Sequence, residues 1–244
     1  MTNKFIMSNN TSSISLKIEQ EIENSIRQRH YDIGDKLPTE NEYCISYSVS
    51  RTVVREALKS LRARGLIEIK KGSGVYVAEL SKKSALDPIN LYFEMSEDKD
   101  LVKNTIYTRQ AFEPEIANLA AKNRQPEHLI LIEKNLSQLY NCPLEDIKQE
   151  TEVDADFHSL ISLAANNPVI SLIMGPIHNL IANHKTLVYG KNSTIDRNEI
   201  RDSVIKFHTN IYEAIKNMDS REAYYQMKEH LRRTETYSQN YNHE

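Results

Sequence analysis

Residues 49–58 read VSRTVVREAL, and this stretch decides how the N-terminal third of the chain folds. Ser50 is a residue type that caps helices, and Val49 and Val54 are spaced as a hydrophobic staple around it. The predicted helix continues to about Arg64, where Gly65 ends it.

The predicted helix is amphipathic, and its polar side is strongly basic. Its basic residues are Arg51, Arg55, Lys59, Arg62 and Arg64, and its single acid is Glu56. Val54, Leu58 and Leu61 supply the side that packs on a core. A capped helix with basic residues at its N-terminal end suits the major groove of DNA.

Two further helices are predicted before this one. The first runs from about Ser13 to His30, because isoleucines recur every four residues from Ile14 to Ile26. Gly34 breaks the chain after it. Thr39 and Glu42 then form a capping box at the start of a short second helix.

Two strands, 66–71 and 75–77, are predicted after the basic helix, with Gly72-Ser73-Gly74 as a tight hairpin between them. Lys70 and Lys71 at its tip can reach backbone phosphate or the adjacent groove. A generic basic surface on a small α+β domain is the alternative interpretation. The order of three helices and a glycine-tipped hairpin favours DNA binding over that alternative.

These motifs resemble the GntR-type winged helix-turn-helix over about residues 14–78. The resemblance rests on the runs 37–40, 49–58, 65–67 and 72–77. It implies that Arg51, Arg55 and Thr52 contact DNA together with the wing glycines. The full set of candidate DNA-binding residues is Ser50, Arg51, Thr52, Arg55, Lys70, Lys71, Gly72 and Gly74. Many members carry arginine directly after the Pro-x-Glu of the second helix, where this chain has Asn41.

Length and charge favour two domains of different character. The chain has 244 residues and a formal net charge of −3. Residues 1–78 carry 12 Lys and Arg against 9 Asp and Glu, so the acidic excess lies in the remainder. We expect a disordered tail over 1–13, the DNA-binding domain over 14–78, a linker over 79–86 and a ligand-sensing and dimerisation domain over 87–240.

The cysteines and the hydropathy predict a cytoplasmic protein. Cys44 and Cys142 are far apart and form no CxxC pair, which favours free thiols in a reducing compartment. No run of apolar residues is long enough for a membrane span, and the polar N-terminus lacks the apolar core of a secretory signal.

The second domain is predicted to be an all-α antiparallel bundle, which makes the chain mainly α. From Ser81 onward there are only two glycines, and helical spacing dominates. The expected helices are Pro88–Ser96, Lys99–Asn123, Pro126–Tyr140, Pro143–Ala165, Pro168–Tyr189, Asp196–Met218 and Ser220–Gln239. Pro126, Pro143 and Pro168 are each interpreted as residues of a first helical turn.

Four side chains of the bundle form a candidate metal site. Asp154 and His158 are four residues apart and so project from one helix face. Alone, such a pair is usually a solvated hydrogen-bonded pair. However, His208 and His230 lie at similar distances before and after the short turn 217–219, which puts them at nearly the same height on antiparallel helices. Three imidazoles and a carboxylate suit Zn²⁺, Ni²⁺ or Mn²⁺ better than Ca²⁺.

Arg109, Glu113 and two further histidines are also candidates for chemistry. Arg109 and Glu113 are four apart beside an apolar stripe, where an interhelical salt bridge is the more common role and a ligand clamp the alternative. His178 and His184 lie on the helix predicted from Pro168, and neither has a carboxylate at helical spacing. Either can line a cavity, and His178 is kept as a candidate pocket residue.

The second domain resembles the FCD domain, the ligand-sensing half of the FadR branch of GntR regulators. The resemblance covers about residues 85–235 and rests on 109–121, on Asp154 to His158 with 166–168, and on the closing run from His208 to Leu231. It assigns metal ligation to Asp154, His158, His208 and His230. It also implies an organic-acid or sugar-acid effector that binds the metal and pairs with Arg109, and it disfavours a fatty acyl ligand.

We therefore expect a regulator, most simply a repressor, in which an effector changes how a homodimer binds a double-stranded DNA operator. The alternative is a metal-dependent hydrolase fused to a DNA-binding module, since a metal with an open position can activate water. Asp156 points away from the ligands on its helix, however, and the sequence contains no nucleophile elbow, P-loop or HExxH motif. A purely structural metal is a third possibility.

Overall fold

The computed structural model describes residues 4–79, 81–98, 100–189 and 196–239, and the side chains of residues 4–12, 82–84, 182–189 and 237–239 fall outside that description. The chain divides into two compact units, Met1–Ala85 and Leu86–Glu244. Each unit has its own hydrophobic core.

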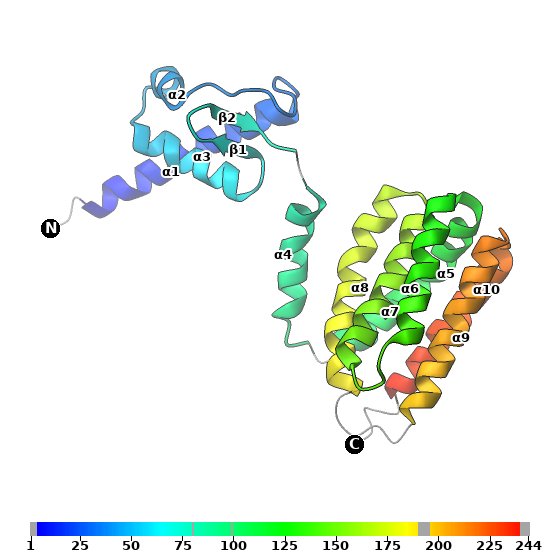
Figure 1. Ribbon diagram of the computed structural model, residues 1–244. Helices are drawn as coiled ribbons and strands as arrows, with labels where there is room; N and C mark the ends of the chain where they lie inside the picture. The colour runs from blue at the N-terminus through cyan, green and yellow to red at the C-terminus, as the bar shows by residue number, and fades with distance from the viewer. Residues whose placement is uncertain (1–3, 80, 99, 190–195, 240–244) are drawn as a thin grey trace. The chain divides into compact units, whose positions relative to one another are not determined.

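The N-terminal unit contains three helices and a hairpin (Figure 1). These are α1 (Lys4–Arg27), α2 (Glu40–Tyr47), α3 (Arg51–Ala63), β1 (Ile67–Lys70) and β2 (Gly74–Val77). The strands are antiparallel, with Ile67 opposite Val77 and Lys70 opposite Gly74. The apolar side of α3 packs against α1, and Val54, Ala57 and Leu61 are fully buried.

The helix starts of this unit differ from the sequence expectation in two respects. Helix α1 begins at Lys4, inside the segment predicted to be a disordered tail, and residues 4–12 contain no glycine or proline to break it. Ser50 occupies the N-cap position of α3, but its side chain makes no capping hydrogen bond. The capping box of α2 is present, since the backbone N–H of Glu42 donates to Oγ1 of Thr39 and that of Thr39 donates to Oε2 of Glu42.

The described residues of the C-terminal unit form helices and the short segments between them, and no strand is present among them. Helix α4 (Lys82–Glu94) begins before the boundary between the units and ends after it. The other helices of this unit are α5 (Leu101–Asn123), α6 (Pro126–Asn141), α7 (Ile147–Ala164), α8 (Pro168–Tyr189), α9 (Arg197–Lys216) and α10 (Ser220–Gln239). Helix α5 packs against α10, α7 packs against both α6 and α8, and α9 packs against α10. The mainly-α architecture with a small two-stranded hairpin is confirmed.

Two proline assignments in this unit were wrong. Helix α7 begins at Ile147 rather than Pro143, because Asp146 supplies the N-cap and its carboxylate accepts from the backbone N–H of Gln149. Pro88 lies inside α4, which starts at Lys82 rather than at the proline. Pro126 and Pro168 do begin their helices.

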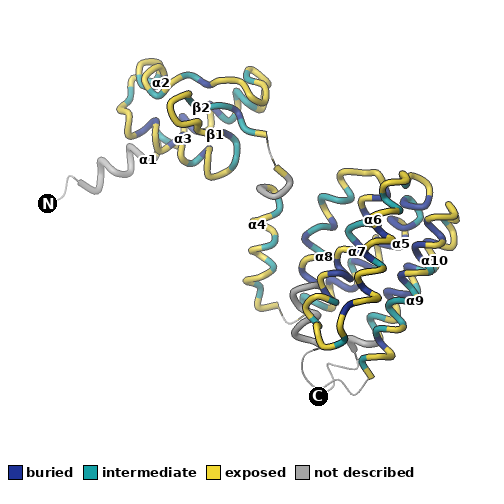
Figure 2. Tube along the Cα trace, viewed as in Figure 1, coloured by how far each residue is buried: buried dark blue, intermediate teal, exposed yellow. Residues whose placement is uncertain are grey.

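The core of the bundle lies between the long helices (Figure 2). Phe157, Ile161, Ile211 and Ile215 are among its most buried side chains, contributed by α7 and α9. Within the described part of the chain, no helix has both the length and the apolar content that a membrane crossing requires. The interior of the bundle also contains charged and imidazole side chains, which form the candidate site.

Candidate functional site

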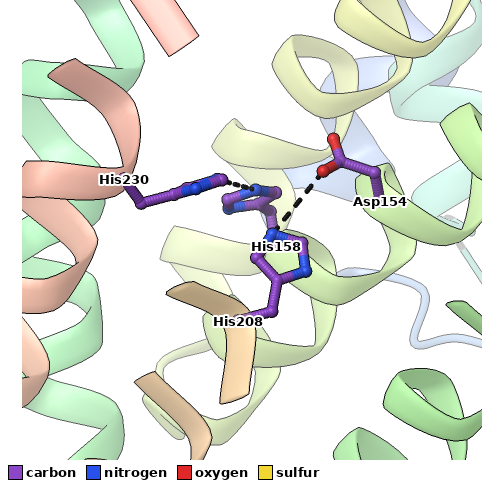
Figure 3. Close-up of side chains that lie close together, drawn as sticks. All are labelled: Asp154, His158, His208 and His230. Atoms are coloured by element: carbon purple, nitrogen blue, oxygen red, sulfur yellow. Dashed lines mark hydrogen bonds and ion pairs between the residues drawn. The ribbon is translucent and has the colours of Figure 1, made fainter. Parts of the chain in front are cut away.

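Four buried side chains from three helices meet inside the bundle (Figure 3). Asp154 and His158 come from α7, His208 from α9 and His230 from α10. One ligand atom from each lies within 4.8 Å of the corresponding atoms of the others, and none of the four is more than 3% exposed. The structure therefore brings together all four residues that the sequence nominated as metal ligands.

The distances inside this cluster are close to those around one ion. The Nε2 atoms of His158 and His230 are 3.3 Å apart, and Nε2 of His208 is 3.5 Å from Oδ1 of Asp154. Donors bonded to Zn²⁺ at about 2.0–2.2 Å lie at most about 4.4 Å apart. The four donors therefore lie close enough together to share one ion after adjustment of their side chains. The donor set, three imidazoles and a carboxylate, fits a borderline transition metal.

Neighbouring side chains hold the ring orientations. Phe157 stacks on the His208 ring with centroids 3.8 Å apart and planes 7° from parallel. Nδ1 of His158 lies 2.7 Å from Oε2 of Glu113 on α5. A carboxylate that accepts the Nδ1–H of an imidazole fixes the tautomer and leaves Nε2 to bind the metal.

Glu113 is the centre of a buried polar network. Its Oε1 accepts from Nε of Arg109 at 2.5 Å and lies 3.2 Å from Nε2 of His178. Burial raises the pKa of Glu113, but the charge of Arg109 and the contacts with His158 and His178 outweigh burial and hold that pKa well below its ordinary value. Glu113 is therefore anionic in the folded protein.

The same surroundings keep His158 neutral. Burial and, to a smaller extent, the charge of Arg109 together lower the pKa of His158 to about 3, even though Glu113 acts in the opposite direction. A neutral imidazole is the form that binds a metal ion. The network around Glu113 therefore prepares His158 as a ligand.

Spacing along one helix did not reveal the role of Glu113. The sequence pairs Glu113 with Arg109 and expects an interhelical bridge, whereas the bridge lies within α5. The contact of Glu113 with His158 on α7 depends on how the two helices pack. Of the two histidines predicted on α8, His178 is 1% exposed and joins this network, while the side chain of His184 lies outside the described residues.

A small cavity adjoins the ligand cluster between α6, α7 and α9. Asp154 lines it, together with Thr151, Ile200 and an ion pair in which Nη2 of Arg197 donates to Oε2 of Glu150 at 2.9 Å. Sequence reasoning did not select Arg197 or Glu150, because neither has a chemical partner at helical spacing. They place a guanidinium–carboxylate ion pair in the same cavity wall as Asp154, a candidate metal ligand.

The predicted DNA-contacting residues lie on one unit. Arg51, Thr52 and Arg55 are exposed on the first turns of α3, next to the N-cap residue Ser50. Nε of Arg55 is 3.6 Å from Oε1 of Glu40, a loose and exposed ion pair.

The hairpin carries the other predicted DNA contacts. Lys70, Lys71 and Gly72 are exposed, and Gly74 is half-buried. Nζ of Lys70 lies 4.7 Å from the centroid of the Tyr76 ring. Both Gly72 and Gly74 have positive φ, which explains why the tip of the wing uses glycine.

Arg64 differs from the other basic residues of the predicted α3 surface. Its guanidinium donates to Glu19 at 2.9 Å and to Glu23 at 2.6 and 3.0 Å, and both acids lie on α1. Arg64 therefore ties the C-terminal end of α3 to α1.

Comparison with known proteins matches each unit to a known family of domains. Residues 14–77 match the bacterial regulatory proteins of the gntR family, and residues 105–233 match the FCD domain. The chain belongs to the GntR family. It is 31% identical over 223 residues to the uncharacterized HTH-type transcriptional regulator YcbG of Bacillus subtilis, covering 91% of this chain and 89% of that one.

Two other relatives are similar over shorter or more divergent stretches. The galactonate operon transcriptional repressor of Escherichia coli is 31% identical over 152 residues, which is 62% of this chain and 66% of that protein. The solved structure of Streptococcus agalactiae GntR superposes with a TM-score of 0.66 at 25% identity, covering 91% of this chain and 99% of the other. The family consists of transcriptional regulators rather than enzymes, so the hydrolase alternative is set aside.

Proposed function

We propose that this GntR-family regulator is a repressor whose DNA binding responds to a small organic or sugar acid, sensed at a zinc ion held by Asp154, His158, His208 and His230. The observation that carries the proposal is the convergence of four buried donors inside a domain joined to a DNA-reading unit. The name of the galactonate operon transcriptional repressor supports an acid effector and a repressing role.

The charged groups around the site suit a carboxylate effector. When bound, the metal supplies a Lewis-acid site at which a carboxylate can coordinate. Arg109 and His178 both contact Glu113, which in turn holds His158, so both border the site and are proposed to respond to the effector. Arg197 now pairs with Glu150. We propose that the carboxylate of the effector replaces Glu150 as the partner of Arg197 at the cavity.

The regulator is proposed to act as a homodimer on a double-stranded operator. Paired helix-turn-helix units read half-sites one helical turn apart, so an effector that changes the spacing of two α3 helices changes the affinity for DNA. Arg51, Thr52 and Arg55, with Ser50 beside them, are proposed to contact the major groove. Lys70, Lys71, Gly72 and Gly74 are proposed to meet the adjacent backbone.

A thermal-shift screen of zinc-loaded and chelated protein tests the effector proposal, with galactonate, glucuronate, lactate and citrate as probes. An acid at 100 times its dissociation constant adds about 2.7 kcal/mol to the stability of the folded state. We expect one acid to raise the melting temperature of the zinc-loaded protein only, and to change operator binding in a gel-shift assay. His208→Ala should abolish the effect, and the exposed His30→Ala should preserve it.

Two results would contradict this proposal in different ways. If chelation destabilises the protein while every acid leaves its melting temperature unchanged, the metal is structural. If chelation changes neither stability nor acid binding, the four donors do not hold a metal.

A further inference from the structure

We propose that a groove between α6, α7 and α8 is a second small-molecule site, distinct from the metal centre, which binds an uncharged polyhydroxylated molecule such as a sugar alcohol. The polar residues that line the groove include Lys134, Asn135, Asp156, Ser159, Ser162 and His178. None of the four metal-ligand candidates lines it.

Two buried polar atoms of groove-lining residues lack a hydrogen-bond partner among the described residues. They are Oδ1 of Asn135 and Oγ of Ser162, and their residues are 3% and 2% exposed. The amide nitrogen of Asn135 donates to the backbone carbonyl of Val153 at 3.0 Å, which identifies Oδ1 as the free acceptor. Buried polar groups are nearly always paired, so two unpaired ones in one groove point to a polar occupant.

A hydroxyl group is both a donor and an acceptor, which are the two partners that these atoms require. It can donate to Oδ1 of Asn135 and accept from the Oγ–H of Ser162. The exposed charges of the groove, one from Lys134 and one from Asp156, cancel and so favour an occupant without net charge. The apolar groups that line the same groove, from Leu131, Leu160 and Leu163, suit the C–H faces of a polyol.

A chain of contacts connects the groove to the metal centre. Oγ of Ser159 lies 3.1 Å from Nδ1 of His178, whose Nε2 lies 3.2 Å from Oε1 of Glu113. The other carboxylate oxygen of Glu113 lies 2.7 Å from Nδ1 of His158. An occupant that reorients Ser159 or His178 therefore changes the support of a metal ligand. By linkage, the polyol and the metal change each other's affinity by the same factor.

Isothermal titration calorimetry of the full chain tests the site, with erythritol, xylitol, sorbitol, galactitol and myo-inositol as probes at up to 5 mM. We expect saturable binding of at least one. Ser162→Ala should weaken that binding at least tenfold without lowering the melting temperature, since the hydroxyl it removes has no partner among the described residues. Ser137→Ala, an exposed position on α6 that does not line the groove, should bind normally.

Chelated protein and His208→Ala separate this site from the metal centre. Polyol binding should persist in both, whereas the acid effect proposed above should disappear. Binding that requires the metal, binding that Ser162→Ala leaves unchanged, or no saturable binding by any probe would each overturn the second site.

The coupling is tested by measuring zinc affinity with and without the polyol. The polyol should change the zinc affinity of the wild-type protein, whereas in Ser159→Ala it should leave that affinity nearly unchanged. An unchanged zinc affinity in the wild-type protein would overturn the coupling.

Discussion

Glu113 is contacted by three side chains that can each carry positive charge. Arg109 lies one turn before it on α5, His158 approaches from α7 and His178 from α8. All four groups are at most 2% exposed, so the network is a buried one. Removing one partner of such a network leaves an uncompensated charge, which typically costs about 3–5 kcal/mol. Glu113 therefore affects both the stability of the bundle and the orientation of a metal ligand.

Replacing Glu113 by glutamine should weaken zinc binding about 10–100-fold, the usual effect of losing a carboxylate that orients a ligating histidine. The measurement is competition for zinc with a chromophoric chelator. Glu115→Gln, on an exposed face of the same helix, is the matched control and should leave affinity unchanged. Equal zinc affinities for Glu113→Gln and the wild type would refute the positioning role.

The lowered pKa of His158 predicts how the stability of the chelated protein depends on pH. Its pKa in the folded protein is about 3, below the ordinary value of 6.5, so the unfolded chain binds the proton first as pH falls. The stability that the neutral ring contributes is complete above pH 6.5 and is lost toward pH 3. Near pH 5 the slope approaches about 1.4 kcal/mol per pH unit.

Urea unfolding of chelated protein at pH 7.5, 6 and 5 measures this slope. His158→Asn should reduce the slope relative to the wild type, and His30→Ala should keep it. A wild-type stability that rises as the pH is lowered from 7.5 to 5 would show that His158 is not held neutral.

The N-termini of the two helices of the helix-turn-helix, α2 and α3, are capped differently. Thr39 caps α2 through a reciprocal pair of hydrogen bonds with Glu42, whereas Ser50 makes no side-chain cap at α3. Helix α3 instead depends on its buried side and on the tie from Arg64 to α1. Two residues of the type that caps helices therefore stabilise their helices to different extents.

Thr39→Ala should destabilise the N-terminal unit by about 1 kcal/mol, the typical effect of losing an N-cap. Ser50→Ala should change its stability by much less, because no capping bond is lost. Chemical unfolding followed by circular dichroism compares the two variants. A larger loss for Ser50→Ala than for Thr39→Ala would contradict the assignment of the caps.

The exposed start of α3 predicts a graded effect on operator binding. Arg51→Ala and Arg55→Ala should each weaken specific binding by about 1–3 kcal/mol, the range for a lost base contact. Arg62→Ala, in the last turn of α3, serves as a control and should have a smaller effect. Fluorescence anisotropy with a labelled operator at fixed salt measures all three. Equal losses at Arg51 and Arg62 would show that the binding is sequence-independent phosphate contact.

The two units of the molecule carry different chemistry. Its N-terminal unit carries the basic helix and wing, and its C-terminal unit contains the buried polar network and the acidic excess. Each unit has a separate core, so changes in one are not expected to unfold the other. The proposed effector response therefore needs two arrangements of the protein to which the effector binds with different affinity.

The proposed homodimer predicts a mass twice 28.2 kDa in sedimentation equilibrium, and a footprint that covers two half-sites about one helical turn apart. His208→Ala should remain dimeric if the metal serves sensing alone. A monomer that protects a single half-site would refute the dimer mechanism.

Much of this protein follows from short stretches of sequence. Helices α8 and α10 have the predicted bounds, the Thr39–Glu42 capping box forms as expected, and Asp154 and His158 share a face because they are four residues apart. Backbone hydrogen bonds and the 3.6-residue period connect neighbours along the chain, so local patterns determine them. The ligand histidines on α9 and α10 were also predictable, because a short turn makes those helices antiparallel neighbours.

Only the tertiary structure decided which helices meet around Glu113. Its contacts with His158 and His178 join α5 to α7 and α8, and its partners on those helices are 45 and 65 residues away. The same packing leaves Oδ1 of Asn135 and Oγ of Ser162 without hydrogen-bond partners among the described residues, and both residues line one groove. It also turns Arg64 toward α1. The rotation of each helix about its axis depends on how side chains of several helices interlock. No spacing within a single helix records that rotation.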